Sequence, residues 1–252
     1  MRRLLFVLLI GLWAVPASAA ITRVEVVTGT ASGGTIVCTF GTPTTLGELI
    51  VLHYKNNGTV APTFSDSGGQ TYTSVYSVSP VANQWNGLIY KENSAAGITS
   101  VTVTINGSGT NGGCHAMHYT GIATSSALDQ NGGTPTSDAG TAWTSAQVTT
   151  TQNDELLIGT DHGRNNGANA TFAASGSWAE IAETLTGVAF DGNGGGGIST
   201  QEQIVAVTQT NIANTGTNVS ALVNNWAGIA TFKMATSGDT RRSTMGTVGV
   251  GR

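Results

Sequence analysis

The feature that most constrains the fold is a succession of short segments with the two-residue periodicity of β-strands. Val, Ile, Thr and aromatic residues alternate with polar ones, and Gly, Asn, Asp or Ser bounds each segment. No stretch shows the 3.6-residue periodicity of an amphipathic helix. The segments are residues 23–28, 35–40, 49–54, 71–78, 87–91, 100–105, 114–119, 146–150, 155–160, 178–184, 200–208, 218–224 and 229–233. About a dozen short strands without intervening helices predict an all-β, antiparallel sandwich.

The strand pattern also echoes itself after roughly 105–115 residues. Glu48-Leu49-Ile50-Val51 resembles Glu155-Leu156-Leu157-Ile158, and residues 63–65 resemble residues 171–173. Two arrangements fit the echo: two small domains in tandem, or one jelly-roll-like sandwich built from two related halves. We favour the second, as a single domain over residues 20–235, because neither half is obviously large enough to bury both faces of its own sheet.

The N-terminus has the three parts of a secretory signal peptide. Arg2 and Arg3 precede an apolar run over residues 4–15, and Ala17-Ser18-Ala19 follows it. The run is about 12 residues long, whereas a membrane-spanning helix needs about 20. We therefore expect cleavage after Ala19 and an exported protein, secreted or held at the cell surface or in the periplasm; the alternative is a retained anchor. The Gly-, Ser- and Thr-rich tail, residues 236–252, is expected to be disordered.

Charge argues against two classes of partner. Removal of residues 1–19 takes away two of the 10 basic residues and none of the 14 acidic ones, so the net charge goes from −4 to −6. A chain this poor in Lys and Arg lacks the footprint of a nucleic-acid-binding protein and the polybasic patch of a membrane-surface protein. We also predict no membrane insertion after cleavage of the leader.

The chain contains two cysteines, Cys38 and Cys114, in strand-like segments. In an oxidising compartment they can form one disulfide. The alternative is two free, buried cysteines that behave as small apolar residues.

Several motifs share their order with a known group of proteins. The segments are Phe64-Ser65-Asp66-Ser67-Gly68-Gly69-Gln70-Thr71-Tyr72, Ile89-Tyr90-Lys91-Glu92-Asn93, Tyr119-Thr120-Gly121-Ile122 and Asn153-Asp154-Glu155-Leu156-Leu157. Over residues 45–233 this order resembles a broad group of secreted bacterial and phage-encoded β-sandwich proteins of unknown function. The usual first motif has Asn at the position of Gln70. The resemblance implies a sandwich fold and a module of surface or virion-associated proteins, and it supplies no catalytic residues.

The sequence gives little evidence for a metal site. His115 and His118 are three residues apart in a strand, so they face opposite sides, but His53 can meet one of them if their strands are neighbours. A zinc site needs three or four converging ligands, and ordinary hydrogen-bonded histidines are the simpler interpretation. Asp191 and Asn193 are weak calcium candidates, because an Asp-Gly-Asn loop is also a common turn. We expect no other cofactor.

Signs of catalysis are also sparse. Glycosidases use two carboxyl groups across a cleft, and Glu180 and Glu183 are the best local pair. In a regular strand a separation of three directs them to opposite faces. No nucleophile elbow or phosphate-binding loop is present. Whether the chain is an enzyme stays uncertain, and the balance of motifs is against it.

We therefore expect a non-catalytic binding or surface module, with an extracellular glycan or another surface protein as its partner. Trp85 and Trp143 lie in polar, loop-like surroundings and are the candidates for stacking on sugar rings, with Tyr76 as a third. The alternative for the two tryptophans is that they cap the ends of the sandwich. The other functional hypotheses are a structural subunit of an extracellular or virion-like assembly, and a glycan-active hydrolase or lyase with an unrecognised site.

Overall fold

The computed structural model describes residues 20–132, 136–164, 171–186 and 196–236. In these ranges all regular elements are β-strands, and the strands pair antiparallel. The prediction of an all-β, antiparallel protein is confirmed. No helix in the described ranges is long and apolar enough to cross a membrane. The predicted leader and tail lie outside these ranges, apart from the first residue of the tail.

The first half of the chain forms an eight-stranded sheet with the order β4-β7-β2-β1-β8-β3-β6-β5. Its strands are β1 (Thr22–Ser32), β2 (Thr35–Thr39), β3 (Leu49–Asn56), β4 (Val60–Asp66), β5 (Thr73–Val81), β6 (Gln84–Lys91), β7 (Ser100–Asn106) and β8 (Gly112–Thr120). The sheet curls into a nearly closed, barrel-like shape, because strands far apart in this order bury side chains in one core. Ile36 of β2 and Val103 of β7 share that core with Leu52 of β3 and Ile89 of β6.

The second half forms a seven-stranded sheet. Its strands are β9 (Leu128–Asn131), β10 (Thr136–Thr144), β11 (Glu155–Arg164), β12 (Phe172–Ala174), β13 (Ala179–Thr186), β14 (Gly196–Val205) and β15 (Thr215–Lys233). The main path is β10-β15-β11-β14-β13, and β9 and β12 also pair with the long β15. The two segments that echo one another in sequence begin β3 and β11. Each strand lies inside its sheet, β3 between β6 and β8, and β11 between β14 and β15.

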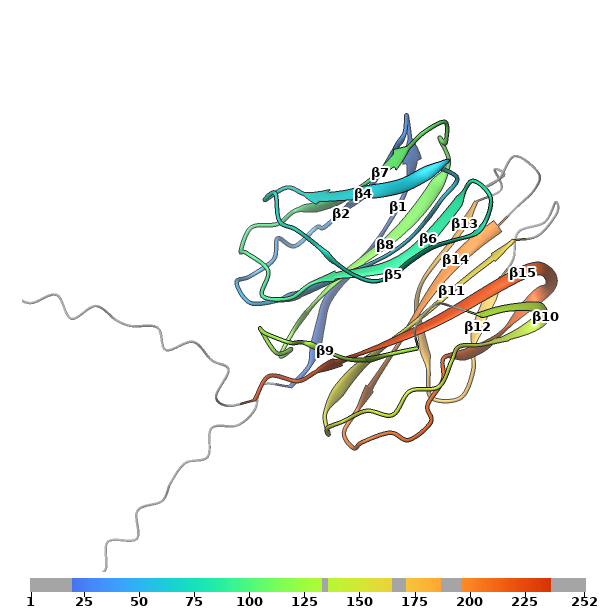
Figure 1. Cartoon of the computed structure of the whole chain (residues 1–252). Helices are drawn as coiled ribbons and strands as arrows, with labels where there is room; N and C mark the ends of the chain where they lie inside the picture. Colours follow the sequence, from blue (N-terminus) through green and yellow to red (C-terminus); the bar gives the residue numbers. More distant parts are fainter. Residues whose placement is uncertain (1–19, 133–135, 165–170, 187–195, 237–252) are drawn as a thin grey trace, which may run out of the picture.

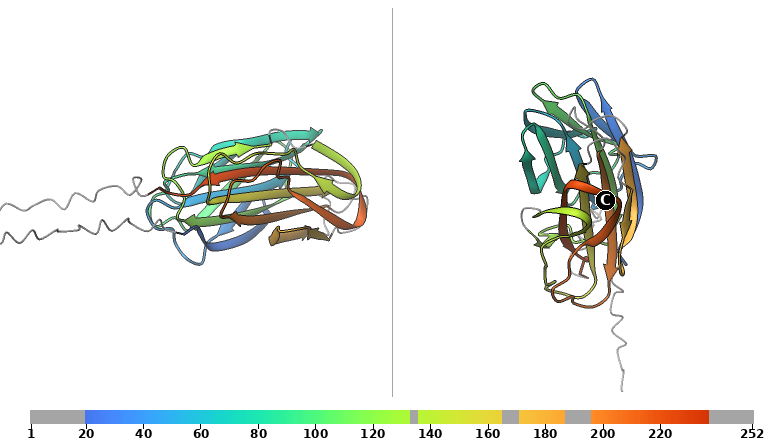
Figure 2. Two further views of the ribbon diagram at one scale, coloured as in Figure 1. Left: turned by 90° about the horizontal axis from the view of Figure 1, so that it is seen from below. Right: turned by 90° about the vertical axis from the view of Figure 1, so that its right-hand side faces the viewer.

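Side chains from both sheets share a second core. Val51 and Met117 of the eight-stranded sheet contribute to it, as do Leu156, Ile158 and Phe232 of the seven-stranded sheet. Figure 1 shows the first-half strands, blue to green, above the second-half strands, yellow to red. The strands of both halves run along the long dimension of the molecule (Figure 2).

A disulfide joins Cys38 of β2 to Cys114 of β8, with an S–S distance of 2.06 Å and a Cα–Cα distance of 6.3 Å. Both cysteines are fully buried in the core of the curled sheet. The free-cysteine alternative does not apply to this structure, because none of the described residues is an unpaired cysteine. The bond links the two strands that flank β1 in the sheet.

Gly29 of β1 lies where β1, β2 and β8 come closest, and it is the register partner of Cys114. A Cβ atom on Gly29 would overlap the carbonyl oxygen of Val37, lie 2.7 Å from its carbonyl carbon and lie 3.0 Å from Cys114 Sγ. We expect Gly29→Ala to lower the free energy of unfolding by about 2 kcal/mol, because backbone atoms cannot make room as a flexible side chain can.

Thermal unfolding followed by circular dichroism measures this effect. Gly113→Ala in the neighbouring strand is the matched control. The Cβ atom that it adds finds its nearest heavy atom, Gly29 O, at 3.5 Å, an ordinary contact. Equal melting temperatures for the two variants would contradict the close approach at Gly29.

Candidate functional site

Two of the histidines, His53 and His115, meet between the sheets. They are register partners on β3 and β8, so the expectation that neighbouring strands bring His53 to one of the pair is confirmed. The Nδ1 atom of each lies within hydrogen-bonding distance of Thr200 Oγ1, at 2.9 Å for His53 and 2.8 Å for His115. His115 Nε2 lies 2.9 Å from Thr184 Oγ1. One threonine hydroxyl of the seven-stranded sheet thus links two rings of the other sheet.

Lys55 and His162 extend this cluster, which we call the inter-sheet polar layer. Lys55 is fully buried, and its Nζ donates to the carbonyl oxygen of Gly163 at 3.1 Å. The His162 ring stacks on Trp226 with centroids 4.9 Å apart and an interplanar angle of 6°. The layer therefore comprises His53, Lys55, His115, His162, Thr184 and Thr200, and it continues the apolar inter-sheet core along the strands.

Burial controls the charge of the layer. It lowers the pKa of His53 to about 3, with a further contribution from the positive charge of Lys55. Burial also lowers the pKa of His115 and of His162 well below 6.5. All three rings are therefore neutral at pH 7. No group of three His, Cys, Asp or Glu residues that could hold a metal ion occurs in the described ranges.

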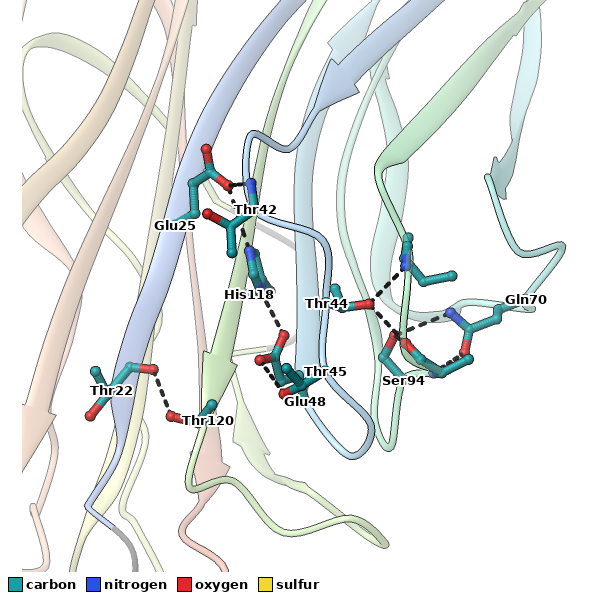
Figure 3. A network of polar contacts seen from close by, with 12 residues as sticks. Thr22, Glu25, Thr42, Thr44, Thr45, Glu48, Gln70, Ser94, His118 and Thr120 are labelled. Atoms are coloured by element: carbon teal, nitrogen blue, oxygen red, sulfur yellow. Dashed lines mark hydrogen bonds and ion pairs between the residues drawn. The ribbon is translucent and has the colours of Figure 1, made fainter.

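His118 lies on the opposite face of β8, as the spacing to His115 predicts, in a separate network (Figure 3). Its Nδ1 lies 2.6 Å from Glu48 Oε2, and its Nε2 faces Glu25 Oε2 at 3.8 Å. Thr45 Oγ1 donates to the other oxygen of Glu48 at 2.7 Å. Since both ring nitrogens are directed at carboxylates, this network ties the loop before β3 to β1 and β8 and leaves no ring nitrogen to activate a nucleophile.

The expectation that Glu180 and Glu183 face opposite sides is wrong, because β13 contains a β-bulge between Glu180 and Ala182. Two residues, Ile181 and Ala182, occupy one position opposite β14, which cancels the change of face. Ile181 packs toward the inter-sheet core. Glu180 pairs with Gln201 and Glu183 with Ser199, so both carboxylates are on the outer face of the seven-stranded sheet, away from the other sheet.

The two carboxylates accept hydrogen bonds from different donors. Ser199 Oγ donates to Glu180 Oε1 at 3.2 Å, and the backbone N–H of Phe172 donates to Glu183 Oε1 at 2.7 Å. Partial burial raises the pKa of Glu180 to about 6, and the negative charge of Glu183 contributes to the shift. Glu180 can therefore carry a proton close to neutral pH.

Three further polar residues surround the pair on the outer face. Asp161 of β11 is the register partner of Ser199 on β14. Its partner on β15 is Ala227, and Asn225 lies two residues before Ala227, on the same face of the sheet. Gln201 and Asn225 are fully buried, and within the described part of the protein neither amide nitrogen nor amide oxygen of these two residues has a hydrogen-bond partner. Buried amides are nearly always paired, so the polar atoms of these two side chains call for a water or ligand partner. We call Asp161, Glu180, Glu183, Ser199, Gln201 and Asn225 the outer polar face.

Two aromatic rings border the outer polar face. Trp143 and Phe172 pack edge to face with centroids 5.7 Å apart. They bury Ala227, the β15 residue opposite Asp161. Phe172 also supplies the backbone N–H that holds Glu183. Trp143, a predicted glycan-stacking residue, thus packs on Phe172, and only 3% of it is exposed.

The other predicted site residues lie elsewhere. Tyr76 is buried between the sheets, where its hydroxyl bonds to Thr160 Oγ1, so it presents no ring face to solvent. Trp85 is half-buried against the core of the curled sheet. The structure therefore does not bring Trp85, Trp143 and Tyr76 together. Asp191 and Asn193 lie outside the described residues.

A hollow of about 450 Å³ opens on the eight-stranded sheet, lined by residues 62–65 and 69–72. The polar side chains at the hollow already form hydrogen bonds within the protein. Gln70 Nε2 donates to Asp66 Oδ2 at 2.9 Å, and Tyr72 donates to the same oxygen at 3.1 Å. The hollow therefore has fewer unpaired polar groups for a ligand than the outer polar face has.

Sequence reasoning missed Ser199, Gln201 and Asn225. Residues 199–203 of β14 are an unbroken polar run, Ser-Thr-Gln-Glu-Gln, which by itself assigns no residue to either face. The signal that could have found them is this polar run together with Glu180 and Glu183. Recognising it requires the bulge, which the sequence pattern does not reveal.

Comparison with known proteins does not extend this description: no family model, no curated protein and no solved structure matches the chain.

Proposed function

We propose that the protein is an exported, jelly-roll-like sandwich of two related halves that binds a carbohydrate on the outer polar face. The signal-peptide pattern supports export, and the disulfide agrees with an oxidising compartment. Membership of the surface-protein group that the chain resembles would fit the same role.

The observation that carries the proposal is the set of buried, unpaired amides next to two carboxylates and an aromatic pair. Gln201 and Asn225 offer both donors and acceptors, which matches the alternating donor and acceptor capacity of sugar hydroxyls. Specific small-molecule sites typically combine aromatic walls with a few polar groups of this kind. Trp143 and Phe172 form a buried aromatic pair at the border of this face, and the backbone N–H of Phe172 fixes Glu183.

The test is glycan-array binding by the full-length mature chain, followed by calorimetry on the best soluble glycan. We expect Gln201→Leu to weaken binding at least about tenfold, the loss of roughly one to two hydrogen bonds. Gln84→Leu is the matched control, because Gln84 is an equally buried glutamine of the other sheet. Both variants are first checked for an unchanged circular dichroism spectrum.

Equal affinity of Gln201→Leu and the parent protein would place the binding site elsewhere, and Trp85 is then the next residue to test. If the array is silent and sedimentation shows concentration-dependent association, the structural-subunit hypothesis is favoured instead.

A further inference from the structure

The outer polar face has the parts of a hydrolytic site as well as those of a binding site. This inference deepens the proposed function and rests on it. We propose that Glu180 and Glu183 hydrolyse a glycosidic bond of the bound carbohydrate, with Glu180 as the general acid and Glu183 as the base that activates water.

The two carboxylates occupy neighbouring positions of one sheet face. The bulge makes Glu180 and Glu183 successive residues of one sheet face, although they are three apart in sequence. Successive same-face positions of a strand are about 7 Å apart. Two side chains on neighbouring positions can bring their carboxyl groups to the separation of about 6.5–9.5 Å at which inverting glycosidases place an acid and a base across the scissile bond.

The two carboxylates also differ in their hydrogen-bond donors. Glu183 is oriented by the backbone N–H of Phe172 at 2.7 Å, whereas Glu180 accepts from the hydroxyl of Ser199 at 3.2 Å. The raised pKa of Glu180, about 6, agrees with the role of proton donor. Two carboxyl groups in unlike surroundings are what acid–base catalysis requires.

A buried amide without a hydrogen-bond partner lies next to the two acids. Gln201 is the register partner of Glu180 on the same face. Its side chain is fully buried, and neither its amide nitrogen nor its amide oxygen bonds to any described residue. A ligand group that enters beside Glu180 can supply the partner that this amide lacks.

Access to the pair comes from its position in the sheet. β13 is the last strand of the order β10-β15-β11-β14-β13, so Glu180 and Glu183 lie at a sheet edge. Glu180 is exposed and Glu183 is partly exposed, while Ser199 and Gln201 behind them are buried. A polymer can therefore approach the carboxylates from solvent.

The reaction balances without a cofactor. The Glu180 carboxyl gives its proton to the glycosidic oxygen, the bond from this oxygen to the anomeric carbon breaks, and the bonding pair stays on the oxygen. Glu183 takes a proton from water as the water oxygen bonds to the anomeric carbon. One water is consumed, and transfer of a proton from Glu183 to Glu180 through solvent restores both groups.

The experiment uses the full-length mature protein and those soluble polysaccharides to which it binds, with borohydride-capped ends. New reducing ends are measured against pH. We expect the parent protein to release reducing ends, with the rate falling above about pH 6. Glu180→Gln and Glu183→Gln should each slow release at least about a hundredfold while binding persists, since acid–base assistance contributes about 10²- to 10⁴-fold.

Glu202→Gln is the control, because Glu202 is in the neighbouring strand but faces the other sheet, where it contacts Tyr119 and Arg23. It should leave the rate unchanged. Melting temperatures show whether each variant folds, and Glu180→Asp should retain part of the activity if the carboxyl itself is required.

The outcomes separate the two proposals. No release from any polymer that the protein binds, or an unchanged rate in Glu180→Gln, overturns hydrolysis and leaves the binding proposal in place. Absence of binding to every polysaccharide overturns the proposed function, and hydrolysis with it.

Discussion

Replacing Cys38 and Cys114 together with alanine is expected to lower the free energy of unfolding by about 4 kcal/mol. The two residues are 76 positions apart, so the disulfide removes much of the freedom of the unfolded chain. Loop-closure entropy accounts for this magnitude. Both sulfur atoms are buried in the core of the curled sheet, where alanine leaves the surrounding apolar packing largely unchanged.

Urea unfolding under non-reducing conditions measures the difference. The control is the addition of a thiol reductant, which should bring the parent protein down to the stability of the double variant and leave the variant itself unaffected. A double variant within about 1 kcal/mol of the parent protein would show that the disulfide contributes little to this fold.

Acidification is expected to destabilise the protein through the inter-sheet polar layer. The pKa of His53 falls from 6.5 in the unfolded chain to about 3 in the buried, folded state. Its contribution to stability is therefore complete above pH 6.5 and is lost as the pH falls toward 3, because only the unfolded chain takes up a proton in that window. From pH 7 to pH 4 the loss from His53 is about 3 kcal/mol.

The measurement compares urea unfolding of the parent protein and His53→Asn at both pH values. The parent should lose about 3 kcal/mol more than the variant. The comparison with the variant is needed because burial raises the pKa of Glu155 to about 7 and that of Glu180 to about 6. These two acids act in the opposite direction and stabilise the folded state as the pH falls. Equal losses in both proteins would contradict a neutral, buried His53.

The candidate site shows how one local irregularity can reverse a sequence argument. Strand periodicity places residues i and i+3 on opposite faces, and that rule holds for His115 and His118. It fails for Glu180 and Glu183, because Ile181 and Ala182 share one position opposite Thr200. Periodicity predicts faces in a regular strand, but nothing in the local residue types distinguishes a bulged strand from a regular one.

The two tryptophans show why local sequence does not predict burial. Trp143 and Trp85 both stand in polar local sequence, which suggests loop tips. Trp143 is instead covered by Phe172, and Trp85 packs against the core of the curled sheet. Local polarity does not reveal burial when the covering residues come from strands distant in the chain.

What the sequence by itself determined is the all-β, antiparallel class, because alternation of apolar and polar residues is a local property that each strand carries on its own. Only the tertiary structure decided that Cys38 reaches Cys114, that His53 meets His115 and Thr200, and that Glu180 and Glu183 join Gln201 on one face. These contacts depend on strand order, register and one bulge, which are set by the packing of the whole chain.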